Sequence, residues 1–372
     1  MREFPATTAD SFVEVIKSPI LCAYIMKRTM NLSKEILRKL PKADLHCHLD
    51  GSLRVDTMIE LAADQGVTLP STNPEELEKA VTVGTSIDSL EEYIHKFEIT
   101  LSVLQTPEAL ERVAYELAED AAKENVRYLE VRYSPVLHTE YGMSETDSID
   151  AVLQGLERAE RDHPILTGLI ICGIRSISPD VSLKLAELAV AYKGKGVLGF
   201  DLAGAEENYP AKHHREAFYL ILNNNINTTL HAGEAYGPES IHQALHYCNA
   251  HRIGHGTRLR EDGDLLNYVT DHRIPLEICL TSNVQTKSVQ GYEKHPVRFY
   301  FDYDVRVTLN TDNRLISNTT LTREYELAHR YYNFTIDDFK EVIINGFKSA
   351  FLPYHKRKYM IQEVLDELDD YT

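Results

Sequence analysis

The sequence has few positively charged residues, no C-x-x-C motif and no long apolar segment, and each absence excludes a class of protein. Among 372 residues, 39 are Lys or Arg and 57 are Asp or Glu, which gives a formal net charge of −18. Nucleic acids and anionic membranes both attract clustered Lys and Arg, so we expect neither as a partner. The apolar stretch "SPILCAYIM" is also shorter than the roughly 20 residues that span a bilayer.

The cysteines and the amino terminus indicate an intracellular protein. The five cysteines include no C-x-x-C pair, which excludes a zinc knuckle and a thioredoxin-like motif. Three of them lie in apolar, strand-like segments, as buried thiols do in a reducing compartment, so we expect a cytoplasmic location. The first residues carry acid where a signal peptide is basic. We expect residues 1–33 to be an extension packed outside one domain of residues 34–372, with Met30 as a second possible start.

Short strand-like segments alternate with longer segments of helical spacing. Thr106 is a plausible helix N-cap, Pro107 suits the first turn, and apolar residues follow at spacings of three and four. The strand candidates are residues 43–48, 126–134, 166–174, 197–204, 227–233, 252–256, 275–283 and 305–312. Eight strands interleaved with helices predict a (β/α)8 TIM barrel. An open doubly wound sheet is the alternative, but it usually carries a Gly-rich phosphate turn after its first strand, and "HLDGSL" is not one.

The connection between the first two strands is unusually long. It covers residues 66–105 and includes "SLEEYIHKFEITL", which has helical spacing. An insertion at this point would lie over the mouth of the barrel, so we expect a helical lid there.

Histidines and acids gather at the ends of the predicted strands. In "KADLHCHLDG", side chains alternate along a strand, so His46 and His48 share a face with Asp44 and Asp50, while Cys47 points away. Later strands end in "DLAG", "LHAGE", "IGHG" and "LNTDN". In a TIM barrel these ends converge on one mouth, where active sites lie. Residues far apart in the sequence would therefore become neighbours.

This convergence predicts a metal site for one zinc ion per chain. Three imidazoles, from His46, His48 and His231, and the carboxylate of Asp312 suit Zn²⁺. A zinc site with a position left for water lowers the pKa of that water to about 7. Glu234 is placed to carry a proton, and His255 is a second acid, base or orienting group. The residues by themselves predict metal-assisted hydrolysis of a small molecule and name no substrate.

Several motifs together identify the chain as resembling the adenosine deaminase family of the amidohydrolase superfamily. They occur in the family's order between about residue 41 and residue 312. The motifs are "KADLHCHLDGSL", "EVRYSP", "GFDLAG", "LHAGE", "RIGHG", "TSNVQT", "HPV" and "TLNTD".

The resemblance implies a role for each site residue. His46, His48, His231 and Asp312 would bind zinc. Glu234 would give a proton to purine N1 while hydroxide attacks C6, and His255 would orient or deprotonate the zinc-bound water. The backbone of Gly204 would hydrogen-bond N3, and Asp50 would accept from the ribose 5′-hydroxyl. Adenosine and 2′-deoxyadenosine would thus be deaminated to inosine and 2′-deoxyinosine.

One residue departs from the family pattern, and it leaves the substrate open. Many members carry two aspartates where this chain has Asp312 and Asn313. The amide of Asn313 can donate to purine N7 at any pH, which an aspartate can do only when protonated. Two alternatives to an adenosine deaminase stay open: a deaminase of a related 6-aminopurine, such as a 5′-modified adenosine or an aminofutalosine-like compound, and a non-catalytic purine-binding barrel. The sequence specifies no oligomeric state.

Overall fold

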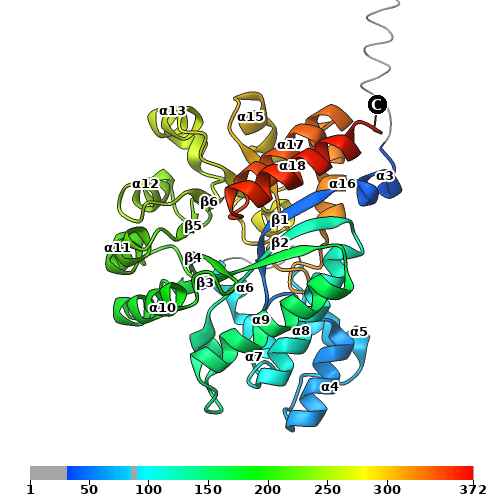
Figure 1. Ribbon diagram of the computed structural model, residues 1–372, viewed down its shortest axis with the longest axis vertical. Coiled ribbons are helices and arrows are strands. Elements are labelled where there is room, and N and C mark those ends of the chain that lie inside the picture. The colour runs from blue at the N-terminus through cyan, green and yellow to red at the C-terminus, as the bar shows by residue number, and fades with distance from the viewer. Residues whose placement is uncertain (1–31, 85–89, 372) are drawn as a thin grey trace, which may run out of the picture.

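Eight parallel strands follow one another in a single sheet, each beside its neighbour in the sequence. The structure, a computed structural model, describes residues 32–84 and 90–371. The strand order is β1-β2-β3-β4-β5-β6-β7-β8, and each strand pairs with the next in parallel. The strands lie at the centre with helices outside them (Figure 1). The strands are β1 (Lys42–His48), β2 (Val126–Tyr133), β3 (Leu166–Ile174), β4 (Val197–Ala203), β5 (Asn227–Ala232), β6 (Arg252–His255), β7 (Leu276–Ile278) and β8 (Val307–Leu309).

The barrel closes between its last strand and its first. Just beyond β8, Asp312 forms an isolated parallel bridge with Cys47 of β1. The Asp312 N–H donates to the His46 carbonyl at 2.8 Å, and the His48 N–H donates to the Asp312 carbonyl at 2.7 Å. This closure confirms the predicted (β/α)8 barrel. It also fixes Asp312 beside two histidines that lie more than 260 positions earlier in the sequence.

Two predicted strands are shorter than expected. The segment 275–283 is strand only at Leu276–Ile278, and its second half begins helix α14 (Leu280–Gln285). The predicted strand 305–312 is regular only at Val307–Leu309. After Ile278 the chain turns into a helix, whereas after Leu309 it keeps isolated ladder bonds, from the Asn310 N–H to Ile278 and between Asp312 and β1.

The helices begin and end where the sequence places caps. Thr106 accepts from the Ala109 N–H and opens α8, while Gly66, at φ 70°, ends α4 in the left-handed conformation. The main helices are α3 (Lys34–Lys39), α4 (Val55–Gln65), α5 (Pro74–Val81), α6 (Leu90–His95), α7 (Phe97–Leu101), α8 (Pro107–Ala122), α9 (Glu145–Asp162), α10 (Pro179–Ala191), α11 (Arg215–Asn223), α12 (Pro238–His246), α13 (Gly263–Asp271), α14 (Leu280–Gln285), α15 (Val297–Asp302), α16 (Leu321–Tyr332), α17 (Ile336–Ser349) and α18 (Tyr354–Leu368). The connection from β1 to β2 thus carries α5, α6 and α7 besides α4 and α8.

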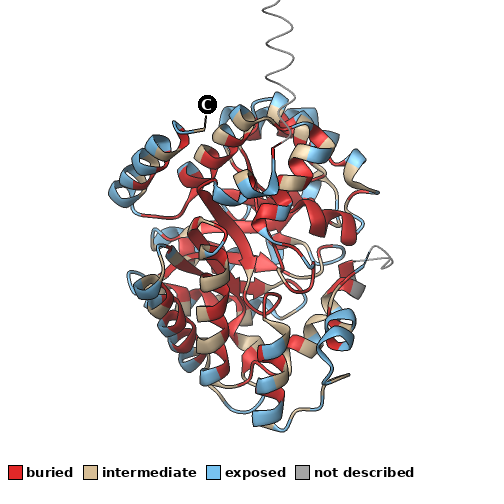
Figure 2. Cartoon of the chain, turned by 90° about the vertical axis from the view of Figure 1, so that its right-hand side faces the viewer, coloured by how far each residue is buried: buried red, intermediate tan, exposed pale blue. Residues whose placement is uncertain are grey.

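Buried residues concentrate on the strands and on the inner faces of the helices (Figure 2). Every residue of β5 except its first is buried, as in other barrel strands that are covered on both faces. Among the described residues, no helix is both long and apolar enough to cross a membrane. The predicted extension falls almost wholly on residues 1–31, which include Met30 and lie outside the described residues.

Candidate active site

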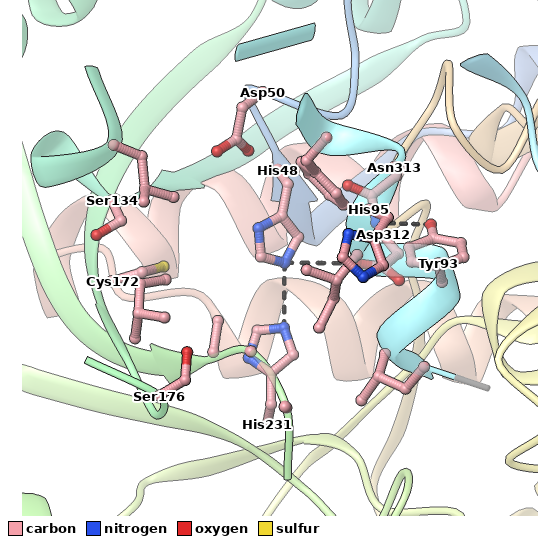
Figure 3. Close-up of a pocket in the computed structure, with 18 of the residues that line it drawn as sticks. His48, Asp50, Tyr93, His95, Ser134, Cys172, Ser176, His231, Asp312 and Asn313 are labelled. Carbon is pink, nitrogen blue, oxygen red and sulfur yellow. Dashed lines mark hydrogen bonds and ion pairs between the residues drawn. The ribbon is translucent and has the colours of Figure 1, made fainter. Parts of the chain in front are cut away.

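Four side chains meet at the carboxyl end of the barrel, where the sequence predicted a metal site. His46 and His48 come from β1, His231 comes from β5, and Asp312 follows β8. One potential ligand atom from each lies within 4.8 Å of all the others. His231 Nε2 is 3.0 Å from His46 Nε2 and 3.1 Å from His48 Nε2. Figure 3 shows the His48 and His231 rings facing one another beside Asp312.

Carboxylates behind two of these rings orient them toward a common point. His46 Nδ1 lies 2.8 Å from Glu277 Oε2, and His231 Nδ1 lies 3.0 Å from Asp201 Oδ2. A carboxylate on Nδ1 holds the proton on that nitrogen and leaves the Nε2 lone pair for a cation. Facing lone pairs repel unless a cation lies between them. Two nitrogens each about 2.1 Å from one tetrahedral ion are about 3.4 Å apart, so the cluster fits a divalent metal.

A buried charge network supports the two carboxylates, and the sequence reading missed it. The Arg132 guanidinium contacts Asp201 at 2.9 Å and Glu277 at 3.0 Å, and all three side chains are fully buried. Arg252 contacts the other oxygen of Glu277 at 2.5 Å and also pairs with Glu130. The available signal was a charged residue inside an apolar strand, as in "EVRY", "GFDL" and "LEIC". A buried charge in such a segment needs a partner from another strand.

Asp44 does not join the cluster. The pairing register of β1 on β2 shifts between Asp44 and Cys47, so the strict alternation expected for this strand is interrupted. The Asp44 carboxylate accepts from the Thr311 backbone N–H at 3.3 Å and from its hydroxyl at 2.7 Å. Thr311 is thus the partner that this buried acid required.

Glu234 lies beside the cluster on a loop that another carboxylate holds. Its Oε2 is 3.5 Å from His255 Nε2. The Glu206 carboxylate accepts from four successive backbone N–H groups, at residues 233 to 236, over 2.6 to 3.0 Å. Burial raises the pKa of Glu234 well above its ordinary value, and the negative charges of Asp312 and Glu206 raise it further. Both effects favour the protonated form of Glu234, which can donate a proton.

A cavity of about 430 Å³ opens in front of the cluster. Asp50, Gly204 and Asn313 all line it, together with Glu234 and His255. Its outer wall includes residues of α6 and α7, so the predicted insertion does lie at the barrel mouth. Most of its remaining wall is apolar.

Backbone geometry and close packing fix two positions in this wall. Gly204 has φ +94°, which a residue with a side chain rarely adopts. A Cβ on Gly51 would lie only 1.9 Å from Asn313 Oδ1, so this glycine leaves room for the amide. The Asn313 amide nitrogen donates to the Tyr93 hydroxyl at 2.8 Å. Burial raises the pKa of Asp50 to about 7.

The fold and the site define a class, a metal-dependent hydrolase barrel with its donor set at the strand ends. The profile of the adenosine deaminase family matches residues 41–367. The chain belongs to the adenosine deaminase family.

Individual relatives agree with this assignment. The chain is 38% identical over 340 residues to an adenosine deaminase of Clostridium kluyveri, a match covering 91% of this chain and 97% of the relative. It is 42% identical over 328 residues to a probable adenosine deaminase of Dictyostelium discoideum, over 88% of this chain but only 42% of the relative's length. Among solved structures it resembles the Arabidopsis N6-mAMP deaminase MAPDA, with a TM-score of 0.79 and 28% identity over 90% of this chain and 99% of that one.

Proposed function

We propose that the protein is a zinc-dependent adenosine deaminase, which hydrolyses adenosine and 2′-deoxyadenosine to inosine, 2′-deoxyinosine and ammonia. The observation that carries the proposal is the meeting of three imidazoles and a carboxylate within 4.8 Å, with Glu234 and His255 beside them in one cavity. We also propose that residues 34–372 act as a single catalytic domain.

His46, His48, His231 and Asp312 would hold the zinc, because neutral imidazole nitrogen and carboxylate oxygen are its usual ligands. Zinc, when bound, supplies hydroxide at neutral pH by lowering the pKa of water to about 7. Glu234 donates its proton to purine N1 as C6 gains oxygen, a role that its raised pKa favours. His255 faces the same point and orients the attacking oxygen. Water is added at C6, and ammonia leaves.

The cavity favours a nucleoside over a nucleotide. We assign the backbone of Gly204 to purine N3 and Asp50 to the ribose 5′-hydroxyl. Asp50 is 4% exposed, and a 5′-phosphate beside it would meet like charge whenever the carboxyl is ionised. Among the described residues that line the cavity there is no lysine or arginine to neutralise a phosphate. The proposed nucleoside preference differs from that of the Arabidopsis enzyme, which is named for a nucleotide, N6-mAMP.

We assign Asn313 to purine N7. One of its two amide protons goes to Tyr93, and the other is left for the purine. If Asn313 reads N7, 7-deazaadenosine reacts with a kcat/KM about tenfold lower than adenosine, since one hydrogen bond is lost. Equal reaction of the two compounds would show that Asn313 does not contact N7.

The direct test is the ultraviolet absorbance change when the metal-loaded protein meets adenosine, 2′-deoxyadenosine, adenine and AMP. We expect rapid turnover of the two nucleosides with release of ammonia, and little reaction of adenine or AMP. A kcat/KM for AMP equal to that for adenosine would refute the role of Asp50. No change with adenosine, in protein that holds its zinc, would keep the hydrolytic site and favour a 5′-modified adenosine as substrate.

A further inference from the structure

Two motifs of the family, "TSNVQT" and "HPV", contribute no residue to the site described so far. The structure shows where they lie. Asn283 is on α14, and His295 immediately precedes Pro296, the N-cap of α15. Both side chains are buried. Asn283 Nδ2 is 2.9 Å from His255 Nδ1, and Asn283 Oδ1 is 3.1 Å from His295 Nε2. Through these contacts both motifs reach the far side of His255.

The donor and the acceptor in each of these hydrogen bonds follow from the bond farthest from His255, which His295 makes with the backbone. The Val297 backbone N–H lies 3.0 Å from His295 Nδ1 and can only donate. His295 Nδ1 is therefore the acceptor. Burial and the nearby charge of Arg260 lower the pKa of His295 to about 3, so the ring is neutral. Its single proton must then be on Nε2.

Each later bond is fixed in turn. The His295 Nε2–H donates to Asn283 Oδ1, which orients the amide so that its nitrogen faces His255. That nitrogen can only donate, so His255 Nδ1 accepts. The opposite amide orientation would set a donor against the His295 donor. His255 is thus left with its proton on Nε2, the nitrogen that lies 3.5 Å from Glu234 Oε2.

We propose that Asn283 and His295 are positioning residues that hold His255 in the Nε2–H tautomer, so that His255 presents a hydrogen-bond donor to the reacting oxygen. We call the hydrogen-bonded series from Val297 through His295 and Asn283 to His255 the relay. His255 could either orient the water or deprotonate it. The relay favours orientation with charge stabilisation, and it excludes proton abstraction by the resting ring. An imidazole whose Nε2 already carries a proton cannot accept another there.

The first test uses the unchanged, metal-loaded protein. Nitrogen-15 labelling of the histidine rings and long-range proton–nitrogen spectra show which ring nitrogen carries the proton, and the His255 signals are assigned by their loss in His255→Gln. We expect the proton of His255 on Nε2 and that of His295 on Nε2. A proton on Nδ1 of His255 in the native protein would overturn the proposal. This test uses no substrate, so it stands apart from the proposed adenosine deaminase activity.

The second test rests on the proposed function and uses the isosteric substitution Asn283→Asp. A carboxylate still accepts from His295 but cannot donate to His255, so His255 should switch to the Nδ1–H tautomer in the same spectra. We expect kcat for adenosine to fall by about 10²–10³-fold, as when an oxyanion donor is removed, with KM and zinc content unchanged. Native kcat in Asn283→Asp, or an unchanged His255 tautomer, would overturn the relay.

Substitutions of His295 separate positioning from simple loss of packing. His295→Phe removes the donor to Asn283 and should lower kcat, while His295→Gln keeps an N–H donor and should recover part of it. The matched control is His329→Phe, because His329, like His295, is hydrogen-bonded through both ring nitrogens, here to the backbone of Leu32 and Phe334. The control should retain native kcat. Equal losses in His295→Phe and His329→Phe would show a structural effect alone.

Discussion

The two ends of the cavity differ in how their polar atoms are held. At the metal end, His46 and His231 each have a carboxylate on the outer nitrogen. At the other end, Asp50 Oδ1 and Ser134 Oγ, which belong to lining residues, and the nearby His138 Nε2 are buried without a hydrogen-bond partner among the described residues.

The difference shows which end is complete before substrate arrives. The metal-end carboxylates are paired with buried arginines, so the donor set is held in place by the barrel itself. At the other end, His138 Nδ1 is bound to the Leu104 carbonyl, which leaves its Nε2 as an acceptor 3.9 Å from Asp50. Unpartnered acceptors are costly when buried and favour a ligand that supplies hydroxyl donors. A ribose does so.

The largest effect should come from removing a metal ligand. His48→Ala takes away one of four donors, so zinc and turnover should be lost together, with kcat lower by at least about 10³-fold while the fold persists. Metal analysis, kinetics and circular dichroism measure the three quantities. His272→Ala, an exposed histidine on the outer surface, serves as the control. Retained zinc in His48→Ala would contradict the ligand assignment.

Removing a supporting carboxylate should weaken both the metal site and the barrel. Glu277→Gln removes the negative charge that pairs with the buried Arg132 and Arg252. The unpaired positive charge should lower the free energy of unfolding by about 3–5 kcal/mol. It also removes the partner of His46, so zinc affinity should fall about 10–100-fold. Denaturant unfolding and metal titration test the two effects. Glu261→Gln, which breaks an exposed pair with Arg258, should change stability by less than about 1 kcal/mol.

Changes at the ribose end should affect substrate recognition and leave the metal alone. Asp50→Ala removes an acceptor for the 5′-hydroxyl, so kcat/KM for adenosine should fall about 10–100-fold. Native enzyme should discriminate against 5′-deoxyadenosine by a similar factor, and the variant should not. Zinc content should stay at one per chain. A variant that still prefers adenosine over 5′-deoxyadenosine would disprove this contact.

The smallest expected effect is a shift in pH dependence from the loop that carries Glu234. The acid form of Glu234 is the donor, so activity falls as pH rises through its raised pKa. Glu206 contributes to that raised value through its negative charge. In Glu206→Gln that charge is gone, the ionised form of Glu234 becomes easier to reach, and the alkaline limb of kcat/KM should move to lower pH. A limb that stays in place or moves upward would rule out this coupling.

Much of the site was predictable because its ligands lie in short local patterns. His46, His48, His231 and Asp312 each follow an apolar segment, and the barrel topology brings such strand ends together. Asp201 and Glu277 were missed because a single charge inside an apolar strand does not reveal which distant strand supplies its partner. Asn283 was missed because "PLEICLTSN" continues as strand by its composition, whereas the chain turns into α14 after Ile278.

The sequence by itself determined the eight strands, the cap residues, the donor types and the family, because these depend on local spacing and on residue chemistry. The tertiary structure decided which atoms of those residues face the metal site and which carboxylates contact His46 and His231. It also decided which ring nitrogen of His255 carries the proton. Those features depend on contacts between different segments of the chain, which lie 28 residues apart for His255 with Asn283 and 231 residues apart for His46 with Glu277. Only the closed barrel brings such segments within hydrogen-bonding distance.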